Sequence, residues 1–489
     1  VALGSHEQAV ALLRSAAAIT DHPVDRAALL RRAASSANAR SHHDEARTLA
    51  EEARATSEQA ADQAGAGLAQ ALLGEILMDA GLIRESRAVL DAAVAALPES
   101  GMDEARAEVY GDLSRVLMRL TESALAVATA DVALAIAERL NLDRIVAESL
   151  NNKGSALGQS RRPREGKALL RAAVEVAQAG GHVAAEIRAL ANMAANIEDP
   201  LESRAVNRQA FDLAMRVGNV NLARWSRESV RFSSFLLAEN WDEPVAESWA
   251  DVDASFGGGA SLNDEARWIT TSAAMRMHRG LPVDELLARL DVIAGAVSDP
   301  TVPAEVLSQQ ASLALLAGDY ARAGRLNLEA ADLGSQITYI YLSFAIRALI
   351  LAGDLEGARL AAARHHEESP GNLIDAALDV AGLAGIAALE GRLEEAIAGY
   401  REAFASLAAI HMDWLIALLG FEFVSLVGSD HPATREAATR SRAIFERVYA
   451  RPWLAKLDAL EVKGHETQAR DSEGRRAPTG PAVRATQRE

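Results

Sequence analysis

Leu316-Ala317-Gly318-Asp319-Tyr320-Ala321-Arg322-Ala323 is the first of three similar stretches in the second half of the chain. The pattern returns as Leu351-Ala352-Gly353-Asp354-Leu355-Glu356-Gly357-Ala358 and as Leu389-Glu390-Gly391-Arg392-Leu393-Glu394-Glu395-Ala396. The glycines of successive copies are 35 and then 38 residues apart. Self-similarity at such a period predicts repeated units that bury their apolar faces against their neighbours.

Each copy has the features of a turn between two antiparallel helices. A glycine, which adopts positive φ readily, ends an amphipathic helix, and an Asp or Arg precedes the next helix. The small residue five positions after the glycine (Ala323, Ala358 or Ala396) lets the two helices approach closely. In the third copy Tyr400 and Ala403 fall where the tetratricopeptide pattern has an aromatic and a small residue, and the spacing is close to the period of about 34 residues of that repeat.

We therefore predict an all-α fold: a tetratricopeptide-like, right-handed superhelical solenoid of about eleven to twelve helical hairpins. Aromatic residues make up only 4% of the chain, while good helix formers such as Ala, Leu, Arg and Glu are abundant. Residues 5–18 are expected to be the second helix of a truncated unit, and a short closing helix is expected near 452–461. The hairpins are predicted at about 24–60, 62–97, 102–140, 142–179, 182–216, 220–256, 262–297, 301–334, 337–367, 371–408 and 411–449.

This pattern divides the chain into four segments. Residues 1–256 and 262–463 are predicted as the two halves of the solenoid, the second ending in the capping helix. Residues 257–261, which begin with a cluster of three glycines, form either a hinge or only a longer loop between hairpins. Residues 464–489 are predicted to be a disordered tail, because they contain too few apolar residues to bury.

Charge and composition restrict the partners and the compartment. A formal net charge of -18 disfavours direct binding to nucleic acid or to an anionic membrane surface. No apolar stretch has the roughly 18 to 20 residues that span a bilayer. The absence of cysteine removes disulfides and thiolate metal sites, so the reducing cytoplasm is the simplest location.

Motifs that carry chemistry are missing from the sequence. Around Gly166-Lys167 the phosphate-binding loop fails, because Ala168 replaces the hydroxyl residue and Arg161 stands where the first glycine belongs. No histidine pair has the H-E-x-x-H spacing of a helical zinc site. We therefore expect no catalytic, cofactor-binding or metal-binding residues, and no cofactor.

The tryptophans suggest a place where a partner binds. Four of the six lie between residues 225 and 268, and arginines accompany them. Aromatic and arginine side chains are enriched at interface hot spots, and the first helix of each tetratricopeptide hairpin lines the concave surface. The candidate groove consists of Trp225, Arg227, Arg231, Trp268 and Arg276. The alternative is that these large side chains fill gaps in an alanine-rich core.

Two stretches resemble a known family. Ser441-Arg442-Ala443-Ile444-Phe445-Glu446-Arg447-Val448-Tyr449-Ala450-Arg451-Pro452-Trp453-Leu454-Ala455-Lys456 resembles the last repeat of bacterial signalling proteins in which an adenylate or guanylate cyclase domain and an AAA-type ATPase domain precede a tetratricopeptide region. The same ending occurs in LuxR-type regulators of the MalT kind. Ala2-Leu3-Gly4-Ser5-His6-Glu7-Gln8-Ala9-Val10-Ala11-Leu12-Leu13 looks like the junction between ATPase and repeats.

The resemblance implies a non-catalytic regulatory arm of a larger bacterial signalling protein. Since the chain begins with Val1 inside a helical pattern, we expect it to be a fragment. No helix-turn-helix pattern follows Trp453, which favours the cyclase-associated family over the LuxR type. A free-standing adaptor is a further alternative. The expected partner is a protein or peptide, with a small-molecule effector as a second candidate.

Overall fold

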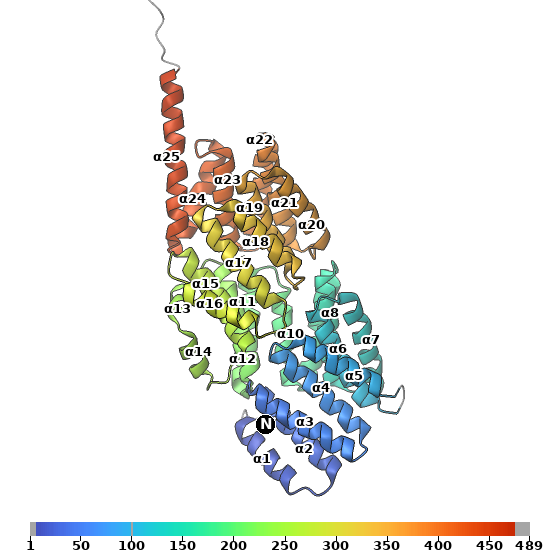
Figure 1. Cartoon of the computed structure of the whole chain (residues 1–489). Helices are drawn as coiled ribbons and strands as arrows, with labels where there is room; N and C mark the ends of the chain where they lie inside the picture. The colour runs from blue at the N-terminus through green and yellow to red at the C-terminus, as the bar shows by residue number, and fades with distance from the viewer. Residues whose placement is uncertain (1–5, 99–100, 475–489) are drawn as a thin grey trace, which may run out of the picture.

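The computed structural model describes residues 6–98 and 101–474; residues 1–5, 99–100 and 475–489 lie outside the described part. Within that part every regular element is a helix, from α1 (His6–Ala18) to α25 (Arg451–Gly474). The helices form an elongated array of antiparallel pairs, with α1 at one end and α25 at the other (Figure 1). The predicted all-helical, tetratricopeptide-like solenoid is confirmed.

The first half begins with α1, followed by five regular hairpins. The helix limits follow the prediction closely, as in the hairpin predicted at 62–97. The paired helices are α2 (Pro23–Asn38) and α3 (His43–Gln59), α4 (Gln63–Asp79) and α5 (Ile83–Ala96), α6 (Asp103–Arg119) and α7 (Ser123–Leu140), α8 (Asp143–Gln159) and α9 (Pro163–Ala179), and α10 (Val183–Ala195) and α11 (Pro200–Val217).

The hairpin predicted at 220–256 is irregular, and here the prediction of two continuous helices is wrong. After α12 (Val220–Leu236) the chain forms two short helices, α13 (Asp242–Ala246) and α14 (Trp249–Ser255). Ala238 and Asn240 between α12 and α13 have positive φ values of 50° and 56°. Pro244 cannot donate an amide hydrogen bond, so it is compatible with the first turn of a new helix but not with the middle of a long one.

The second half contains five further hairpins. Their helices are α15 (Leu262–His278) and α16 (Asp284–Ala294), α17 (Thr301–Ala317) and α18 (Tyr320–Asp332), α19 (Thr338–Ala352) and α20 (Leu355–Glu368), α21 (Leu373–Leu389) and α22 (Leu393–Ala409), and α23 (Asp413–Val427) and α24 (Pro432–Arg447).

The closing helix is longer than predicted. The sequence predicts an end near residue 461 and a disordered tail from 464, but α25 continues to Gly474. Residues such as Glu466, Gln468, Ala469 and Arg470 have good intrinsic helix propensity, so this stretch extends a helix that is already nucleated. The remainder of the predicted tail, residues 475–489, lies outside the described residues.

The repeated turns have the geometry that the sequence predicts. Gly318, Gly353 and Gly391 adopt φ values of 85°, 75° and 78°. Asp319 accepts a hydrogen bond from the amide of Arg322, so its side chain caps the start of α18. The alanines at 323, 358 and 396 are fully buried, as close approach of paired helices requires.

The first half uses the same turn but often lacks the glycine. Ser41, Ala61, Thr121 and Arg161 end hairpin helices with φ between 57° and 63°. Residues with a side chain reach this left-handed region at a cost of roughly 1 kcal/mol. The repeat signal is therefore faint in the sequence where the backbone repeat is intact.

Ala61→Gly is expected to raise the free energy of unfolding by roughly 0.5 to 1 kcal/mol, because glycine adopts the φ of 57° at this exposed position without strain. Urea denaturation followed by circular dichroism measures the change. Ala60→Gly is the matched control, since Ala60 has an ordinary φ of -82° and glycine should not stabilise it. Equal effects of the two substitutions would contradict the strain at Ala61.

The three-glycine segment is held in place by the neighbouring helices. Gly257, Gly258 and Gly259 all have positive φ, near 80° to 87°. Arg224 of α12 donates to the carbonyl of Gly258 at 2.8 Å and to the carboxylate of Asp253 at 2.6 Å. The same carboxylate accepts the amide of Ala260 at 3.0 Å. These bonds support a fixed loop rather than a hinge.

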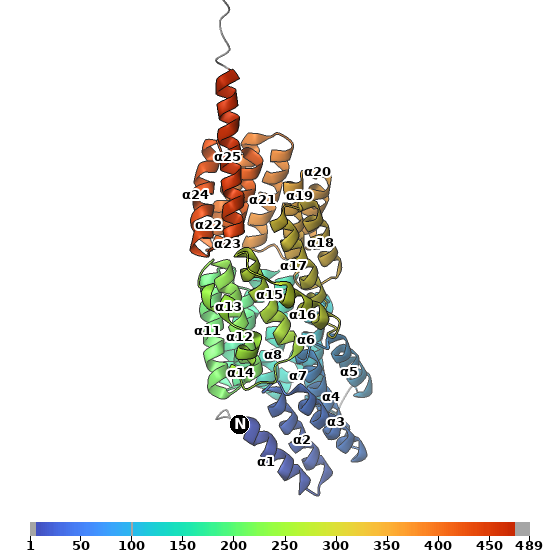
Figure 2. The same ribbon diagram turned by 60° about the vertical axis from the view of Figure 1, so that its left-hand side comes forward.

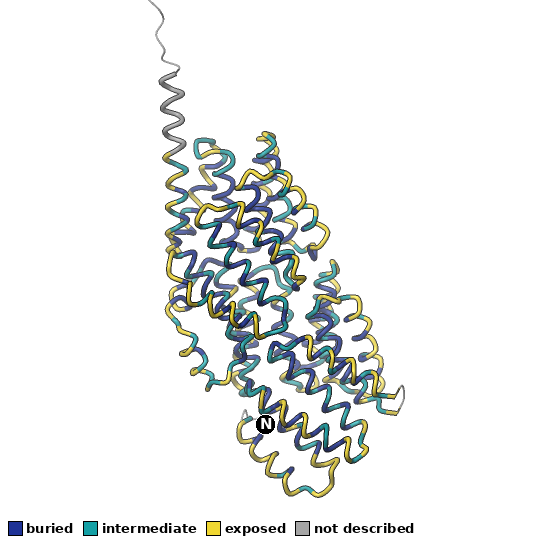
Figure 3. The backbone as a smooth tube through the Cα atoms, viewed as in Figure 1, coloured by how far each residue is buried: buried dark blue, intermediate teal, exposed yellow. Residues whose placement is uncertain are grey.

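Neighbouring helices bury the sides that face one another and expose the outer positions (Figure 3). The first helices of successive hairpins, such as α4, α6, α8 and α10, contact one another extensively, whereas their second helices touch far less. The first helices therefore follow the shorter, inner arc of the curved array. We call the side chains that they present there the inner face.

The superhelix is tightly wound, because segments 175 to 214 residues apart are in direct contact. The turn after α16 donates an amide hydrogen bond to Gly81, and Arg119 pairs with Asp299 at 2.5 Å. Near the other end, Arg447 donates to the carbonyls of Leu237 and Ala238 at 2.9 Å. In Figure 2 the helices α23 to α25 lie above α13 and α15, and α23 contacts α12 while α25 contacts α15. About five to six hairpins thus complete one turn, and successive turns touch.

Candidate binding surface

A stripe of charged side chains covers the inner face of α4, α6 and α8. On α6 these are Glu108, Asp112, Arg115 and Arg119, spaced so that they share one side of the helix. Arg144 of α8 binds Glu108 at 2.6 Å and Glu148 at 2.8 Å. The stripe therefore joins successive hairpins by ion pairs.

Arg188 of α10 extends this network across the inner face. It binds Glu148 at 3.0 Å and approaches Glu75 of α4 at 3.7 Å. Arg115 also contacts α4, with Asp79 at 3.0 Å and Glu75 at 3.5 Å. Charges from four different hairpins thus meet at one place on the inner face.

The pKa values of two carboxylates in this network are shifted in opposite directions. Burial alone would raise the pKa of Glu148, but Arg144, Arg188 and Arg115 outweigh it and the pKa is lowered. Burial raises the pKa of Glu108, and the cation of Arg144 only partly offsets this effect. These groups are desolvated although solvent still reaches part of each side chain, as expected in a recess.

Asp112 is the carboxyl group of this network that lacks a partner. It forms no hydrogen bond and no ion pair with any other residue that the structure describes, and it is partly exposed. Burial, followed by the nearby carboxylates of Glu75, Glu108 and Glu148, raises its pKa well above the usual value. A cationic ligand group beside Asp112 would reverse that shift.

The residues of the predicted groove do not share one surface, because two of them are buried. Trp268 and Arg231 are only 3% and 6% exposed, so both belong to the core and cannot anchor a partner as they stand. Arg231 binds Glu228 and donates to Ser272 at 2.8 Å, while its guanidinium carbon lies 5.8 Å from the Trp268 ring centroid. For these two residues the structure contradicts the groove and supports the core-filling alternative.

Two other residues of the predicted groove have structural partners. Arg227 binds Glu228 at 3.4 Å and also Glu247. Arg276 donates to the carbonyls of Val245 at 2.9 Å and Pro282 at 3.2 Å. Both hold the irregular α13–α14 segment against α12 and α15.

Trp225 is the aromatic residue of the predicted groove that keeps an exposed part, and the sequence prediction does not include its neighbour Arg267. Trp225 is half-buried on α12, and the guanidinium carbon of Arg267 on α15 lies 6.0 Å from its ring centroid. Arg267 directly precedes Trp268 in the sequence but faces differently. The helical period of 3.6 residues predicts that Arg267 and Trp268 point to different sides of α15. The local sequence does not show, however, that Arg267 lacks an ion-pair partner.

Three other tryptophans form an aromatic cluster between successive superhelical turns. Trp241 lies between α12 and α13, Trp414 on α23 and Trp453 on α25, and all three are at most 2% exposed. The ring centroids of Trp241 and Trp414 are 4.9 Å apart. The ring centroid of His278 on α15 lies 4.8 Å from that of Trp414. His278 Nδ1 accepts a hydrogen bond from Trp453 Nε1 at 3.0 Å. These tryptophans join the turns rather than line a groove.

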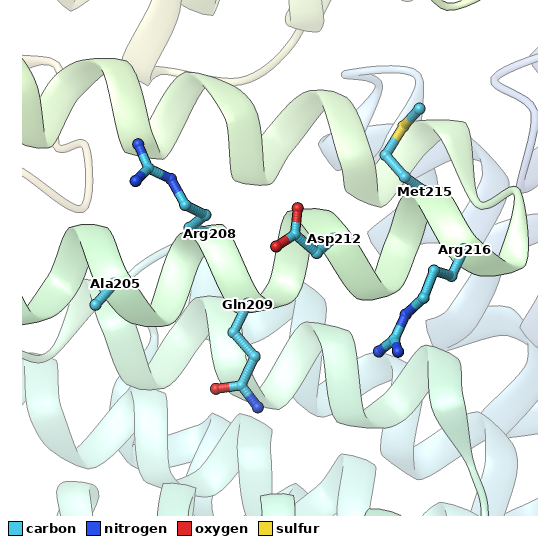
Figure 4. Close-up of a pocket in the computed structure, with 6 residues that line it drawn as sticks. All are labelled: Ala205, Arg208, Gln209, Asp212, Met215 and Arg216. Carbon is cyan, nitrogen blue, oxygen red and sulfur yellow. The ribbon is translucent and has the colours of Figure 1, made fainter.

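A hollow of about 690 Å³ lies on the outer helix α11. Its six lining residues, which include Arg208, Asp212 and Met215, all project from this one helix (Figure 4). A second hollow of about 270 Å³ lies between α5 and α6. Binding sites are normally lined by convergent groups from several elements, so the α11 surface is a poor candidate.

Metal sites and membrane-spanning helices are both absent from the described residues. None of their His, Asp and Glu side chains form a group of three or more placed to hold a metal ion. No helix in residues 6–98 and 101–474 combines the length and apolar character needed to cross a bilayer.

Comparisons with known proteins add little. No family model matches the sequence, and no curated protein matches it. Similar solved structures include the Rap protein complexed with competence and sporulation factor, with 12% identity and a TM-score of 0.45, covering 79% of this chain and 99% of that one. Yeast Tom70 has 13% identity and a TM-score of 0.30, covering 92% and 99%. A circular tandem repeat protein has 16% identity and a TM-score of 0.13, covering 96% and 97%. These values are too low to support an argument about function.

Proposed function

We propose that this chain is a non-catalytic scaffold that binds an extended peptide, or an extended segment of a partner protein, on the inner face of its superhelix. The observation that supports this most directly is Asp112, a recessed carboxyl group without a partner among the described residues. Concave surfaces of helical-repeat arrays are extended and suit such ligands. A lysine or arginine side chain or a free amino terminus would provide the missing cation.

We further propose that the scaffold is the regulatory arm of a larger bacterial signalling protein of the cyclase–ATPase kind. The support is the resemblance of residues 441–456 to the last repeat of that family. The net charge of -18 and the absence of cysteine support a cytoplasmic location without direct nucleic-acid binding. Determining the complete reading frame tests this proposal. A cyclase or ATPase domain upstream supports it, while a helix-turn-helix downstream or a start codon at Val1 would support a LuxR-type regulator or an adaptor instead.

Peptide retention tests the binding proposal. Immobilised protein is incubated with random pentapeptides that contain one lysine, and retained peptides are quantified by mass spectrometry. We expect retention to increase as the pH rises from the acidic range to pH 8, because the pKa of Asp112 is raised and more of the attracting carboxylate is present at the higher pH. Asp112→Asn should weaken retention by at least about fivefold at pH 8 and flatten this pH dependence.

Asp212→Asn is the matched control, since Asp212 lies in the hollow on α11. Retention unchanged in Asp112→Asn but lost in Asp212→Asn would place the ligand on α11 and refute the inner-face proposal. No retention by the wild-type protein at any pH would refute peptide binding.

A further inference from the structure

Arg267 is a recessed cation on the inner helix α15 with no hydrogen bond or ion pair to any other residue of the described chain. Its guanidinium carbon lies 6.0 Å from the centroid of the Trp225 ring. Burial lowers the pKa of Arg267, so its charge is incompletely compensated. A desolvated cation without a partner is unfavourable, and a ligand anion would relieve this.

Carboxylates near Arg267 are already engaged. Asp264 accepts from the amide and hydroxyl of Ser261, at 3.1 Å and 2.8 Å, in the capping box that starts α15. Asp299 pairs with Arg119 and accepts the amide of Thr301 at 2.9 Å. Glu228 binds Arg231 through both carboxylate oxygens. Arg267 therefore remains the cation without a carboxylate of its own.

We propose that Arg267, together with the exposed part of Trp225, binds a carboxylate of the peptide held on the inner face. Arginine recognises carboxylates through paired hydrogen bonds, and the tryptophan ring provides a face against which the adjoining residue packs. This inference rests on the proposed peptide-binding function and names the group that the site selects.

The position of Arg267 also gives the ligand a direction. Arg119, whose charge influences Arg267, lies seven residues after Asp112 on the same side of α6. Seven helical residues span about 10 Å, which corresponds to about three residues of an extended peptide. The ligand would therefore run from Asp112 towards the end of α6, with a basic group at Asp112 and a carboxylate at Arg267.

The experiment uses two random pentapeptide libraries, one with a free carboxyl terminus and one amidated, applied to the immobilised full chain. We expect the free-acid library to be retained at least about tenfold better, and Arg267→Gln to abolish that preference. Arg267→Lys should restore part of it. If acidic side chains provide the carboxylate instead, amidated peptides that contain Asp or Glu will be retained and will lose retention in Arg267→Gln, which also supports the site.

Arg208→Gln, in the hollow on α11, is the matched control, and thermal unfolding shows whether each variant folds. Arg267→Gln should unfold at or above the wild-type temperature, because it removes an uncompensated cation.

Retention that is equal for acid and amide and unaffected by Arg267→Gln would overturn the carboxylate site while leaving peptide binding intact. A thermal shift by inorganic phosphate that disappears in Arg267→Gln, without any peptide preference, would show a simple anion site and overturn the inference. No retention of either library would instead refute the proposed function.

Discussion

Trp414→Ala is expected to lower the free energy of unfolding by about 3 to 5 kcal/mol, because it empties the centre of the aromatic cluster between turns. The Trp414 ring lies within 6 Å of the rings of Trp241, Phe235, His278 and Phe445. These residues come from both halves of the chain, so the substitution weakens the connection between turns as well as the local packing. Urea unfolding should change from one transition to two, as the C-terminal hairpins unfold separately.

Trp249→Ala is the control for this prediction. Trp249 is half-buried, and its recorded ring contact is with Trp268 at 5.8 Å, away from the cluster. Its removal should leave the number of transitions unchanged and have a smaller effect. If Trp414→Ala costs no more than Trp249→Ala, the cluster does not join the two turns.

Acidification should weaken the same connection through His278. Trp453 Nε1 can only donate, so Nδ1 of His278 must accept and the ring must be neutral. Burial, with a smaller contribution from the cation of Arg347, lowers the pKa of His278 to about 3. As the pH falls below 6.5, the imidazole of His278 takes up a proton in the unfolded chain but stays neutral in the folded chain. The folded state is therefore progressively destabilised relative to the unfolded state as the pH falls towards 3. The expected loss between pH 7 and pH 4.5 is about 2 to 3 kcal/mol.

His278→Gln should remove this part of the pH dependence, because glutamine accepts a hydrogen bond through Oε1 without titrating in this range. The measurement is the difference in unfolding free energy between pH 7 and pH 4.5 for both proteins, so that other titrating groups cancel. Equal pH dependence in the two proteins would show that protonation of His278 does not limit acid stability.

The hairpins could be predicted from the sequence because each one depends on local features. Gly318 and Asp319 end one helix and cap the next within two residues, and Ala323 marks the contact between them. The same signals were misleading between residues 237 and 256, where Pro244 and two residues with positive φ break the second helix. The full length of α25 is not predicted from the sequence, because the low apolar content of residues 464–474 is typical of a disordered segment.

The binding surface was less predictable, because it depends on contacts between distant segments. Trp241 and Trp414 are far apart in the sequence and yet pack together, and no local pattern reveals that the superhelix brings them into contact. Arg231 and Trp268 have the residue types of a hot spot but are buried. Asp112 and Arg267 are distinguished by having no hydrogen-bond or ion-pair partner among the residues that the structure describes, a property that only the folded chain defines.

The contact between successive turns also limits how this molecule can deform. An open superhelix behaves as a spring that can shorten or lengthen, whereas a coil whose turns already touch is at its minimum length. Bonds such as Arg447 to Leu237 and Trp453 to His278 must break before the coil can stretch. A ligand that changes the shape of this protein must therefore lengthen or unwind it, so the resulting displacement would be directed outward along the axis of the superhelix.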